Sequence, residues 1–294
     1  LILLNFSTVC ADDVDNEVNF EDTIEVTASN VSELPKTNSR RYIVYDRISK
    51  SMIIGKNEDV KSAMASTTKI MTTIVILEKT DLNETVTVSA KAGGTGGSRL
   101  GLKKGDKASI KDLLYGLMLR SGNDAAVALA EHVGGSVKEF AELMNEKASE
   151  LGLTNTHFVT PHGLDDANHY TTALELAKLT DYAMDNETFA KIVGTKSTTI
   201  YINNQSRQIN NTNELLGVLN GVVGVKTGFT NNAGRCLVTE TKRNNMDIIT
   251  IVLGADTKKD RTKDSVNLIE YTFSKYKMYN LEEQIIKEFN KWKN

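Results

Sequence analysis

The sequence predicts an α+β protein in which one antiparallel sheet is built from both ends of the chain and a helical region is inserted between them. Two short β-rich runs occur early, at residues 42–45 and 52–54, and three longer runs occur late, between residues 221 and 255. The segments between them repeat apolar residues at helical spacing. Strands at both ends and helices in the middle favour a single sheet closed by the two ends of the chain.

The composition is that of an ordinary globular protein. The chain has 294 residues, of which 40% are hydrophobic and 25% are charged, and its formal net charge is −3. Because a nucleic-acid-binding surface needs clustered basic residues, this charge balance argues against a nucleic-acid partner. No run of about 18 apolar residues occurs, so the sequence predicts no transmembrane helix.

The first eleven residues have the pattern of the end of a secretory signal peptide. LILLNFSTVCA joins an apolar run to a small-residue cleavage pattern, and an acidic segment follows. We expect residues 1–11 to be a truncated signal and residues 12–39 to be an acidic, loosely structured leader. A buried strand, a short membrane anchor and a lipid-modified Cys10 are the alternatives. With the signal removed, Cys236 is the one remaining cysteine, so neither a disulfide nor a cysteine metal site is expected.

The folded domain is expected to begin with a hairpin formed by the two early β-rich runs. A helix is predicted after Ser66, because Ile70, Ile74 and Leu77 recur on one face. The middle of the chain is predicted to be helical, with two helices within residues 109–135 that break at Ser121-Gly122-Asn123, one over 136–152, and one over 171–184 with Thr171 or Thr172 as its N-cap.

The end of the chain returns to strands. Residues 221–230, 234–243 and 246–255 are predicted strands, and the last two are joined by Asn244-Asn245. A helix over residues 261–277 is predicted to follow them.

Ser66 and Lys69 lie one helical turn apart and therefore share a face of the predicted helix. The N-terminus of a helix offers N–H groups and partial positive charge, so a serine there could attack a carbonyl carbon. A lysine one turn further on could take the serine proton if burial or a second cation favoured its neutral form. Taken alone, the pattern also fits an ordinary helix cap and a solvated lysine.

Ser121-Gly122-Asn123 lies at the break between two predicted helices. Its hydroxyl could relay a proton in a cleft, and its carboxamide could hold a substrate amide. Because serine, glycine and asparagine are also favoured in caps and turns, an ordinary turn is the alternative.

Lys226-Thr227-Gly228 lies in a predicted strand, where alternate residues share a face, so Lys226 and Gly228 point one way and Thr227 the other. Gly228 would let a ligand backbone approach closely. A lysine and a threonine beside it could bind a carboxylate, although an exposed strand with a solvated lysine also fits.

In this order, S-x-x-K, S-x-N and K-T-G resemble the motifs of the D-alanyl-D-alanine carboxypeptidases, the low-molecular-weight penicillin-binding proteins. The similarity includes MASTTKIMT, LLYGLMLRSGNDAAVALAEHVGGS, MNEKASELGLTNTHFVTPHGLD, HYTTALELAKL and GVKTGFTNNAGRCLV, and it covers roughly residues 40–275. The resemblance implies a catalytic domain over this range with a β-lactamase/transpeptidase-like fold. It implies no metal and no other cofactor.

The resemblance also implies a role for each matching residue. Ser66 would be the acylated nucleophile and Lys69 its general base, with Ser121 as the third catalytic residue. The implied substrate-binding residues are Asn123, Lys226, Thr227, Gly228 and Phe229. The backbone N–H groups of Ser66 and Phe229 would form the oxyanion hole, and Lys226 would add a second positive charge near Lys69.

The substrate implied by the resemblance is a peptidoglycan stem peptide ending in D-Ala-D-Ala, and β-lactam antibiotics would be covalent inhibitors. Such an enzyme acts outside the cytoplasm. A β-lactamase is one alternative, although TPHGLDD lacks the glutamate pattern that would activate a deacylating water. A penicillin-binding protein that binds cell-wall peptides with little turnover is another.

Two positions depart from the family pattern. Val223 stands where aspartate is frequent, and Leu174-Glu175 stand where arginine and aspartate are more usual. We expect altered support of the site rather than lost activity. Residues 276–294 read as an amphipathic helix, which could lie on a membrane surface or dock on the domain.

Two other segments could suggest ligand sites. His162, Asp165 and His169 could hold a metal, but their spacing favours histidines that order the loop before the helix at Ala173. The glycine-rich residues 93–101 lack the features of a phosphate loop. We expect them to form a flexible loop at the rim of the active site.

Overall fold

The computed structural model describes residues 33–276. The predicted signal remnant, most of the acidic leader and residues 277–294 of the predicted C-terminal helix lie outside the described residues. The proposed membrane contact of that helix therefore stays a prediction. Among residues 33–276, no helix combines the length and apolar character needed to cross a bilayer.

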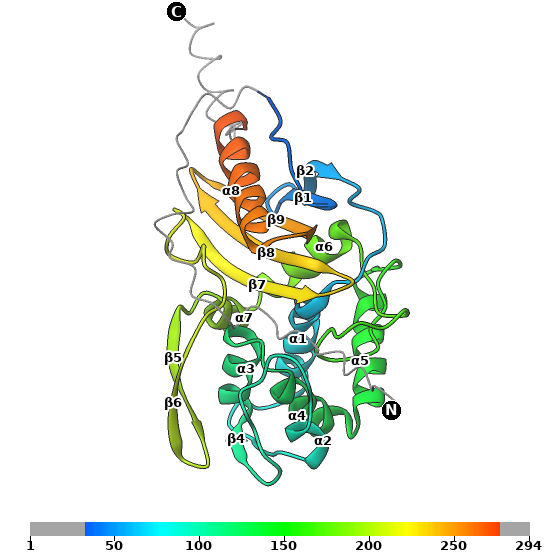
Figure 1. Cartoon of the computed structure of the whole chain (residues 1–294), viewed down its shortest axis with the longest axis vertical. Helices are drawn as coiled ribbons and strands as arrows, with labels where there is room; N and C mark the ends of the chain where they lie inside the picture. The colour runs from blue at the N-terminus through cyan, green and yellow to red at the C-terminus, as the bar shows by residue number, and fades with distance from the viewer. Residues whose placement is uncertain (1–32, 277–294) are drawn as a thin grey trace, which may run out of the picture.

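The centre of the fold is a five-stranded antiparallel sheet with strand order β2-β1-β9-β8-β7 (Figure 1). Its strands are β1 (Arg41–Asp46), β2 (Ser51–Lys56), β7 (Val222–Thr230), β8 (Gly234–Arg243) and β9 (Met246–Ala255). The first and last strands within residues 33–276 pair directly, with Ile43 opposite Ile251. The predicted fold class, a sheet closed by both ends of the chain, is therefore confirmed.

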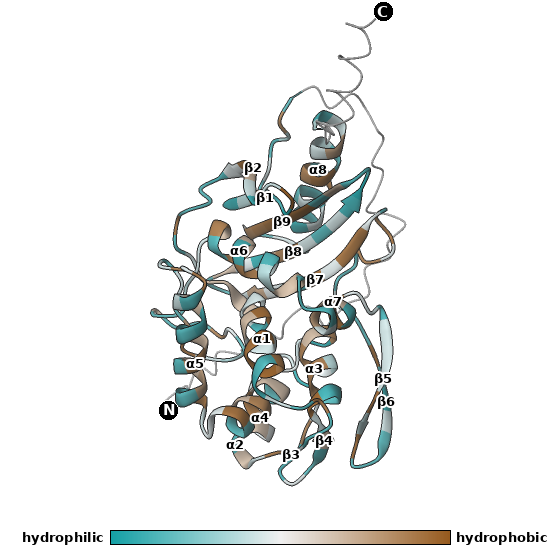
Figure 2. Ribbon diagram, turned by 180° about the vertical axis from the view of Figure 1, so that it is seen from behind, coloured by the Kyte–Doolittle hydropathy of each residue, from teal (hydrophilic) through white to brown (hydrophobic). Residues whose placement is uncertain are grey.

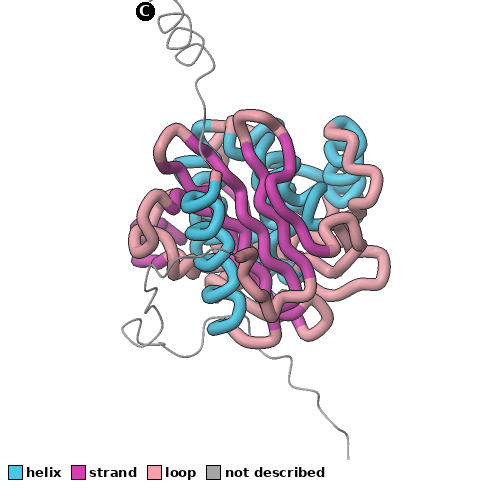
Figure 3. Tube along the Cα trace, turned by 90° about the horizontal axis from the view of Figure 1, so that it is seen from above, coloured by secondary structure: helices cyan, strands magenta, loops and turns pink. Residues whose placement is uncertain are grey.

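Each face of the sheet packs on a different layer. Helix α8 (Lys258–Lys275) lies along one face of the sheet (Figure 3). Its Leu268 belongs to one apolar cluster with Val252, and its Ile269 to another with Leu237. The inserted helical region lies against the other face (Figure 1). The site described below lies where this region meets the edge of the sheet.

The helical region contains a short 3₁₀ helix and seven α-helices within residues 33–276. In order these are η2 (Ala65–Thr68), α1 (Lys69–Lys79), α2 (Ala90–Gly93), α3 (Ile110–Leu119), α4 (Asn123–Gly134), α5 (Val137–Glu150), α6 (Ala173–Met184) and α7 (Glu187–Val193). Thr172 is the N-cap of α6 and accepts a hydrogen bond from the Glu175 N–H, which decides between the two predicted caps.

Helix α1 forms the centre of the core, and Figure 2 shows apolar residues concentrated along α1 and α4. Ile70 and Ile74, on the predicted apolar face, are fully buried, whereas Leu77 is half-buried. Met71 and Ile76 are buried as well, so the helix packs on several sides. The residues at its N-terminus are therefore held in a rigid frame.

The structure differs from the sequence prediction at the start of α1. Ser66 was expected at the beginning of the helix itself, but residues 65–68 form a 3₁₀ turn and the α-helix begins at Lys69. The threonine side chains explain this geometry, because Thr67 Oγ1 donates to the Met64 carbonyl and Thr68 Oγ1 donates to the Ala65 carbonyl.

Two small two-stranded sheets and two short helices were not predicted from the sequence. β3 (Thr85–Thr87) pairs with β4 (Lys107–Ser109), and these strands are too short to show a clear alternation. β5 (Ser197–Ile202) pairs with β6 (Gln205–Asn210) and packs Ile200 and Ile202 into the core. The missed helices are α2, which lies between β3 and β4 in the chain, and α7, which lies just before the β5–β6 hairpin.

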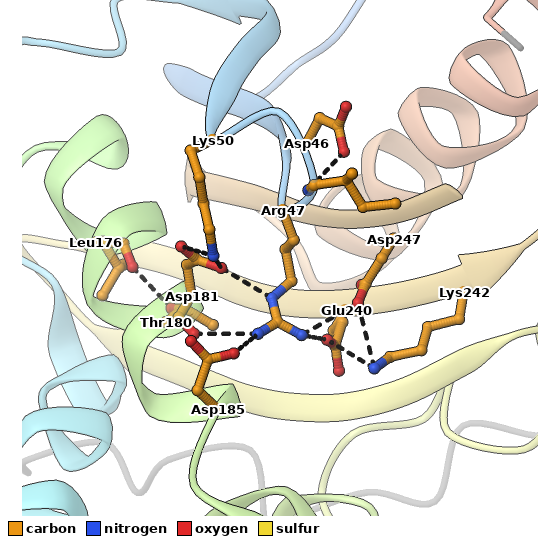
Figure 4. A network of polar contacts seen from close by, with 11 residues as sticks. Asp46, Arg47, Lys50, Leu176, Thr180, Asp181, Asp185, Glu240, Lys242 and Asp247 are labelled. Carbon is orange, nitrogen blue, oxygen red and sulfur yellow. Dashed lines mark hydrogen bonds and ion pairs between the residues drawn. The ribbon is translucent and has the colours of Figure 1, made fainter. Parts of the chain in front are cut away.

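A buried cluster of charges ties α6 to the sheet (Figure 4). Arg47, after β1, pairs through Nε with Asp181 at 2.9 Å and through Nη2 with Asp185 at 2.6 Å. Its Nη1 contacts Glu240 on β8 and Asp247 on β9, the latter at 3.1 Å. Lys50 and Lys242 complete this Arg47 cluster from its exposed rim.

Candidate active site

Ser66 lies in η2, between α1 and strand β7, and its side chain is almost fully buried. The residue before it, Ala65, has a φ of +48°. A non-glycine residue in this region costs energy, and such conformations gather at functional sites. Thr68 Oγ1 also lies 2.7 Å from His169 Nε2, so the turn is fastened to the loop that precedes α6.

Lys69 is fully buried and aims its amine at Ser66. Its Nζ lies 2.8 Å from Ser66 Oγ, 2.8 Å from Asn123 Oδ1 and 3.0 Å from the His162 carbonyl oxygen. These three acceptors are neutral oxygens. They come from η2, from the start of α4 and from the loop before α6, so three separate segments converge on one amine.

The three partners of Lys69 differ in what they can donate. The amide oxygen of Asn123 and the carbonyl oxygen of His162 only accept hydrogen bonds, whereas the Ser66 hydroxyl can also donate. A neutral amine has two N–H groups and one lone pair. With both N–H groups on the carbonyl-type oxygens, the lone pair would face the Ser66 hydroxyl, which is the geometry needed for proton transfer from Ser66 to Lys69.

Ser121 and Asn123 form the turn between α3 and α4, which was predicted as a break between helices. Ser121 is buried and has a φ of +58°, a second strained non-glycine residue at the site. The Asn123 N–H donates to the Ser98 carbonyl at 2.7 Å, and Asn123 Nδ2 donates to the Gly96 carbonyl at 2.9 Å. The turn therefore holds both Lys69 and the glycine-rich loop.

The glycine-rich loop lies beside the site, as predicted. Gly97 has a φ of +77°, and a Cβ added there would lie 2.5 Å from Asn123 Nδ2, so a side chain at this position would displace Asn123. Asp124, which is buried, accepts hydrogen bonds from the N–H groups of Leu100, Gly101 and Leu102, each at 2.9 Å. This carboxylate fastens the loop to the start of α4.

Strand β7 brings Lys226-Thr227-Gly228 to the turn that carries Ser66. A Cβ added at Gly228 would lie 3.0 Å from the Ser66 nitrogen, so glycine permits the close approach of β7 to η2. Lys226 and Thr227 are buried, and Lys226 Nζ donates to the Thr227 carbonyl at 2.8 Å. Thr227 Oγ1 lies 2.8 Å from Thr212 Oγ1. Thr227 thus contacts the segment that contains Thr212, whereas Gly228 lies beside the turn that carries Ser66.

Phe229 lies next along β7 and is half-buried. The guanidinium group of Arg235, opposite it on β8, lies 3.8 Å from the centre of its ring. This cation–π contact fixes the ring at the end of the strand segment that lies beside η2.

The histidines of the 160s loop order that loop, as expected. His169 Nδ1 accepts from the Val159 N–H at 2.9 Å, and His162 Nδ1 accepts from the Leu164 N–H at 3.2 Å. Burial, followed by the positive charge of Lys69, lowers the pKa of His162 to about 3. Burial lowers the pKa of His169 to about 4. Within residues 33–276, no group of three His, Cys, Asp or Glu side chains could hold a metal.

Glu175 and Val223, which depart from the family pattern, both lie within the described residues and have defined contacts. Glu175 is buried at the start of α6 and accepts from the Asn155 N–H at 2.9 Å and from Thr156 Oγ1 at 2.6 Å. It therefore supports the loop that follows α5. Val223 is half-buried against the core of the helical region.

The structure also brings to the site three groups that the sequence did not reveal. The His162 carbonyl contacts Lys69, Asp124 anchors the glycine-rich loop, and Thr212 contacts Thr227. Asp124 directly follows the S-x-N motif and could have been noticed there. A backbone carbonyl and a threonine in a turn leave no signal in the sequence.

A family model described as D-alanyl-D-alanine carboxypeptidase, peptidase S11, matches residues 27–257. The chain belongs to this family. It is 37% identical over 245 residues to the D-alanyl-D-alanine carboxypeptidase DacF of Bacillus subtilis, and this match covers 81% of this chain and 63% of DacF. With DacC of Escherichia coli it shares 38% identity over 270 residues, or 84% of this chain and 64% of DacC.

This member of the D-alanyl-D-alanine carboxypeptidase family thus spans less than two thirds of the length of those two relatives. The match to the solved structure of the Streptomyces K15 DD-transpeptidase covers a larger fraction of that protein than the matches to DacF and DacC cover of theirs. The TM-score is 0.78 at 33% identity, and the match covers 82% of this chain and 99% of the other. The predicted transpeptidase-like fold is therefore confirmed.

Proposed function

We propose that this chain is a serine-type D-alanyl-D-alanine carboxypeptidase that removes the terminal D-alanine from peptidoglycan stem peptides. The observation that carries the proposal is the contact of 2.8 Å between Lys69 Nζ and Ser66 Oγ, with the amine held by two further oxygens that only accept. A buried lysine aimed at a serine suits activation of that serine as a nucleophile.

In the proposed reaction, Ser66 Oγ attacks the carbonyl carbon of the D-Ala-D-Ala amide while Lys69 takes the hydroxyl proton. The backbone N–H groups of Ser66 and Phe229 stabilise the oxyanion. The proton passes to the leaving amine by way of Ser121, D-alanine departs, and an ester on Ser66 remains. Water then attacks this ester, which releases the shortened peptide and returns the proton to Ser66.

The proposed substrate lies along β7. Within the described sheet this strand is at the edge and pairs only with β8, so one row of its backbone groups can pair with a peptide. Gly228 keeps the strand close to Ser66. Lys226 and Thr227 bind the terminal carboxylate of the substrate, and Asn123 holds its penultimate amide.

The same site would react with β-lactam antibiotics. Their carboxylate would bind as the substrate carboxylate does, and attack of Ser66 on the strained amide would open the ring and leave a stable ester on Ser66. Because peptidoglycan lies outside the cytoplasm, the protein acts on the cell-wall side of the membrane. Water is the proposed acyl acceptor. An amine in its place would give transpeptidation, and adding one to the assay measures the ratio of the two reactions.

The test is D-alanine release from diacyl-Lys-D-Ala-D-Ala by the wild-type chain, by Ser66→Ala and by the control Ser149→Ala, which changes an exposed serine on α5. We expect release by the wild type and the control and none by Ser66→Ala. Labelling by a fluorescent penicillin should follow the same order. Labelling without D-alanine release would contradict the carboxypeptidase proposal and indicate a penicillin-binding protein with little turnover, or a β-lactamase if the label is lost rapidly.

A further inference from the structure

Thr212 joins the two walls of the site. Its N–H donates to the carbonyl of Leu119, the last residue of α3, at 3.0 Å. Its Oγ1 lies 2.8 Å from Thr227 Oγ1 on β7. Thr212 thus connects the helix that leads into Ser121 with the strand proposed to bind the substrate.

The position of Thr212 is fixed by the asparagines on either side of it. Asn211 Nδ2 donates to the carbonyls of Val193 and Thr195, at 3.2 and 3.1 Å. Asn211 Oδ1 accepts from the Asn213 N–H at 2.9 Å, which closes a tight turn around Thr212. The hydroxyl of Thr212 is therefore presented to Thr227 by a preorganised segment.

The contact between the two hydroxyls constrains their protons. Each threonine has one O–H, so one hydroxyl must donate to the other. If Thr212 donates to Thr227 Oγ1, the O–H of Thr227 is left to donate to an incoming group. A carboxylate only accepts hydrogen bonds, so this arrangement suits it, and the first bond strengthens the second by polarisation.

The protein contains the same arrangement at a second place, with its carboxylate present. Thr156 Oγ1 donates to Glu175 Oε2 at 2.6 Å and lies 2.7 Å from Thr171 Oγ1. Because the Thr156 proton is used on the carboxylate, its oxygen accepts from Thr171. In this fold, therefore, one threonine donates to a second threonine, which donates to a buried carboxylate. Thr212 and Thr227 have the geometry of the two threonines in this hydrogen-bonded chain, without the carboxylate.

We propose that Thr212 is a positioning residue that donates to Thr227 Oγ1 and thereby directs the Thr227 hydroxyl toward the terminal carboxylate of the substrate. The inference rests on the proposed function, in which Thr227 binds that carboxylate. Thr212 itself does not touch the reacting atoms. Its contribution therefore depends on a carboxylate at the end of the substrate.

The experiment compares a peptide ending in D-Ala-D-Ala acid with the same peptide ending in a carboxamide. The variants are Thr212→Val, which keeps the shape without the hydroxyl, Thr212→Ser, which keeps the hydroxyl, and Thr171→Val, which breaks the matching pair at Glu175. The measured quantity is the ratio of kcat/KM for the acid to kcat/KM for the amide. We expect Thr212→Val to lower this ratio about tenfold, about 1.4 kcal/mol, mainly through KM.

Thr212→Ser should stay within about twofold of the wild-type ratio, and Thr171→Val should leave it unchanged. An unchanged ratio in Thr212→Val, or an equal fall in Thr171→Val, would overturn the proposal. Thr212→Ala is a second variant without the hydroxyl. If both it and Thr212→Val fail to fold, as measured by thermal unfolding, the proposal is overturned, because Thr212 would then be a structural residue.

The rate of acylation by benzylpenicillin, compared with its methyl ester, is the second measurement. It also separates the two proposals. If the wild type releases no D-alanine but reacts with penicillin, the carboxypeptidase proposal fails, and the acid-to-ester ratio still tests Thr212. A lower acid-to-ester ratio in Thr212→Val supports the inference, and an equal ratio contradicts it.

Discussion

Lys69 and Arg47 are both buried basic side chains, and the oxygens that accept their hydrogen bonds differ in kind. Arg47 contacts four carboxylates, whereas Lys69 donates to three neutral oxygens. Burial opposes the charge of Arg47, but the carboxylates of Glu240 and Asp181 outweigh it and raise the pKa of Arg47. Hydrogen bonds to neutral oxygens favour the charged form of a buried lysine less strongly than carboxylates do, which suits a lysine proposed to lose and regain a proton.

The chemistry of the two side chains suits these surroundings. A guanidinium group cannot be deprotonated in proteins, whereas a lysine amine can be. The Arg47 cluster therefore serves as a permanent connection between α6 and the sheet. In the proposed reaction, by contrast, Lys69 must change its protonation state. Four substitutions or measurements test this contrast, and the expected effects decrease from one to the next.

Lys69→Arg keeps a positive charge at the proposed base but removes the amine that can become neutral. We expect acylation by a fluorescent penicillin to slow by about 10³-fold, within the range typical of general-base removal. Thermal unfolding of the purified variant serves as the control for folding. Acylation within about tenfold of the wild type would contradict the assignment of Lys69 as the base.

Arg47→Met should leave the chemistry intact and weaken the fold. Removing the cation leaves Glu240 and Asp181 buried without their main partner, which costs about 3 kcal/mol of unfolding free energy. Denaturant unfolding measures this loss. The matched control is Lys50→Met, whose side chain is 53% exposed and whose loss should cost less than about 1 kcal/mol. Equal costs in the two variants would contradict a dominant role for Arg47.

Glu240→Gln tests the excess of negative charge around Arg47. Burial, followed by the charge of Asp247, raises the pKa of Glu240 to about 7 in the folded protein. The folded state then holds a proton that the unfolded state loses from about pH 4.5 upward, so this group stabilises the fold at low pH. Its contribution is lost as pH rises toward 7, with a slope of at most about 1.4 kcal/mol per pH unit.

Unfolding free energies of the wild type and Glu240→Gln at pH 5, 6 and 7 measure this contribution. Glutamine carries no titrating proton, so the variant should show a flatter pH dependence. Parallel curves for the two proteins would contradict the raised pKa.

His162 should show the smallest effect, which is no titration at all above pH 5. Its pKa of about 3 keeps the ring neutral there, because burial and the charge of Lys69 disfavour the imidazolium. The ring proton resonances of His162, followed by NMR from pH 8 to pH 5, should stay constant. A midpoint near 6.5, the ordinary value for histidine, would show that the site is more open or less positive than described.

The sequence revealed the sheet and the three motifs because each leaves a local pattern. Runs rich in apolar and β-branched residues marked β8 and β9, and Asn244-Asn245 marked the turn between them, where both residues have positive φ. The β5–β6 hairpin, which was not predicted, has the same Asn-Asn pair in its turn, at Asn203-Asn204, with φ values of 53° and 61°. That hairpin could have been predicted from the same rule.

The Arg47 cluster could not have been predicted. Its members come from the β1–β2 turn, α6, β8 and β9, so only the folded chain brings them together. The contact between Thr212 and Thr227 is hidden for a related reason, since it depends on the turn that Asn211 and Asn213 form. Long-range polar contacts leave no periodicity in a sequence, whereas helices and strands do.

The pairing of β1 with β9 has a consequence for the order in which the site is assembled. During synthesis Ser66 and Lys69 emerge long before Lys226, and the strand that carries Lys226 can join the sheet only when the last strands of the chain are present. Contacts between such distant segments form late in folding. A partly synthesised chain therefore carries Ser66 and Lys69 without Lys226, and the proposed nucleophile gains its contact with β7 only after the late strands have emerged.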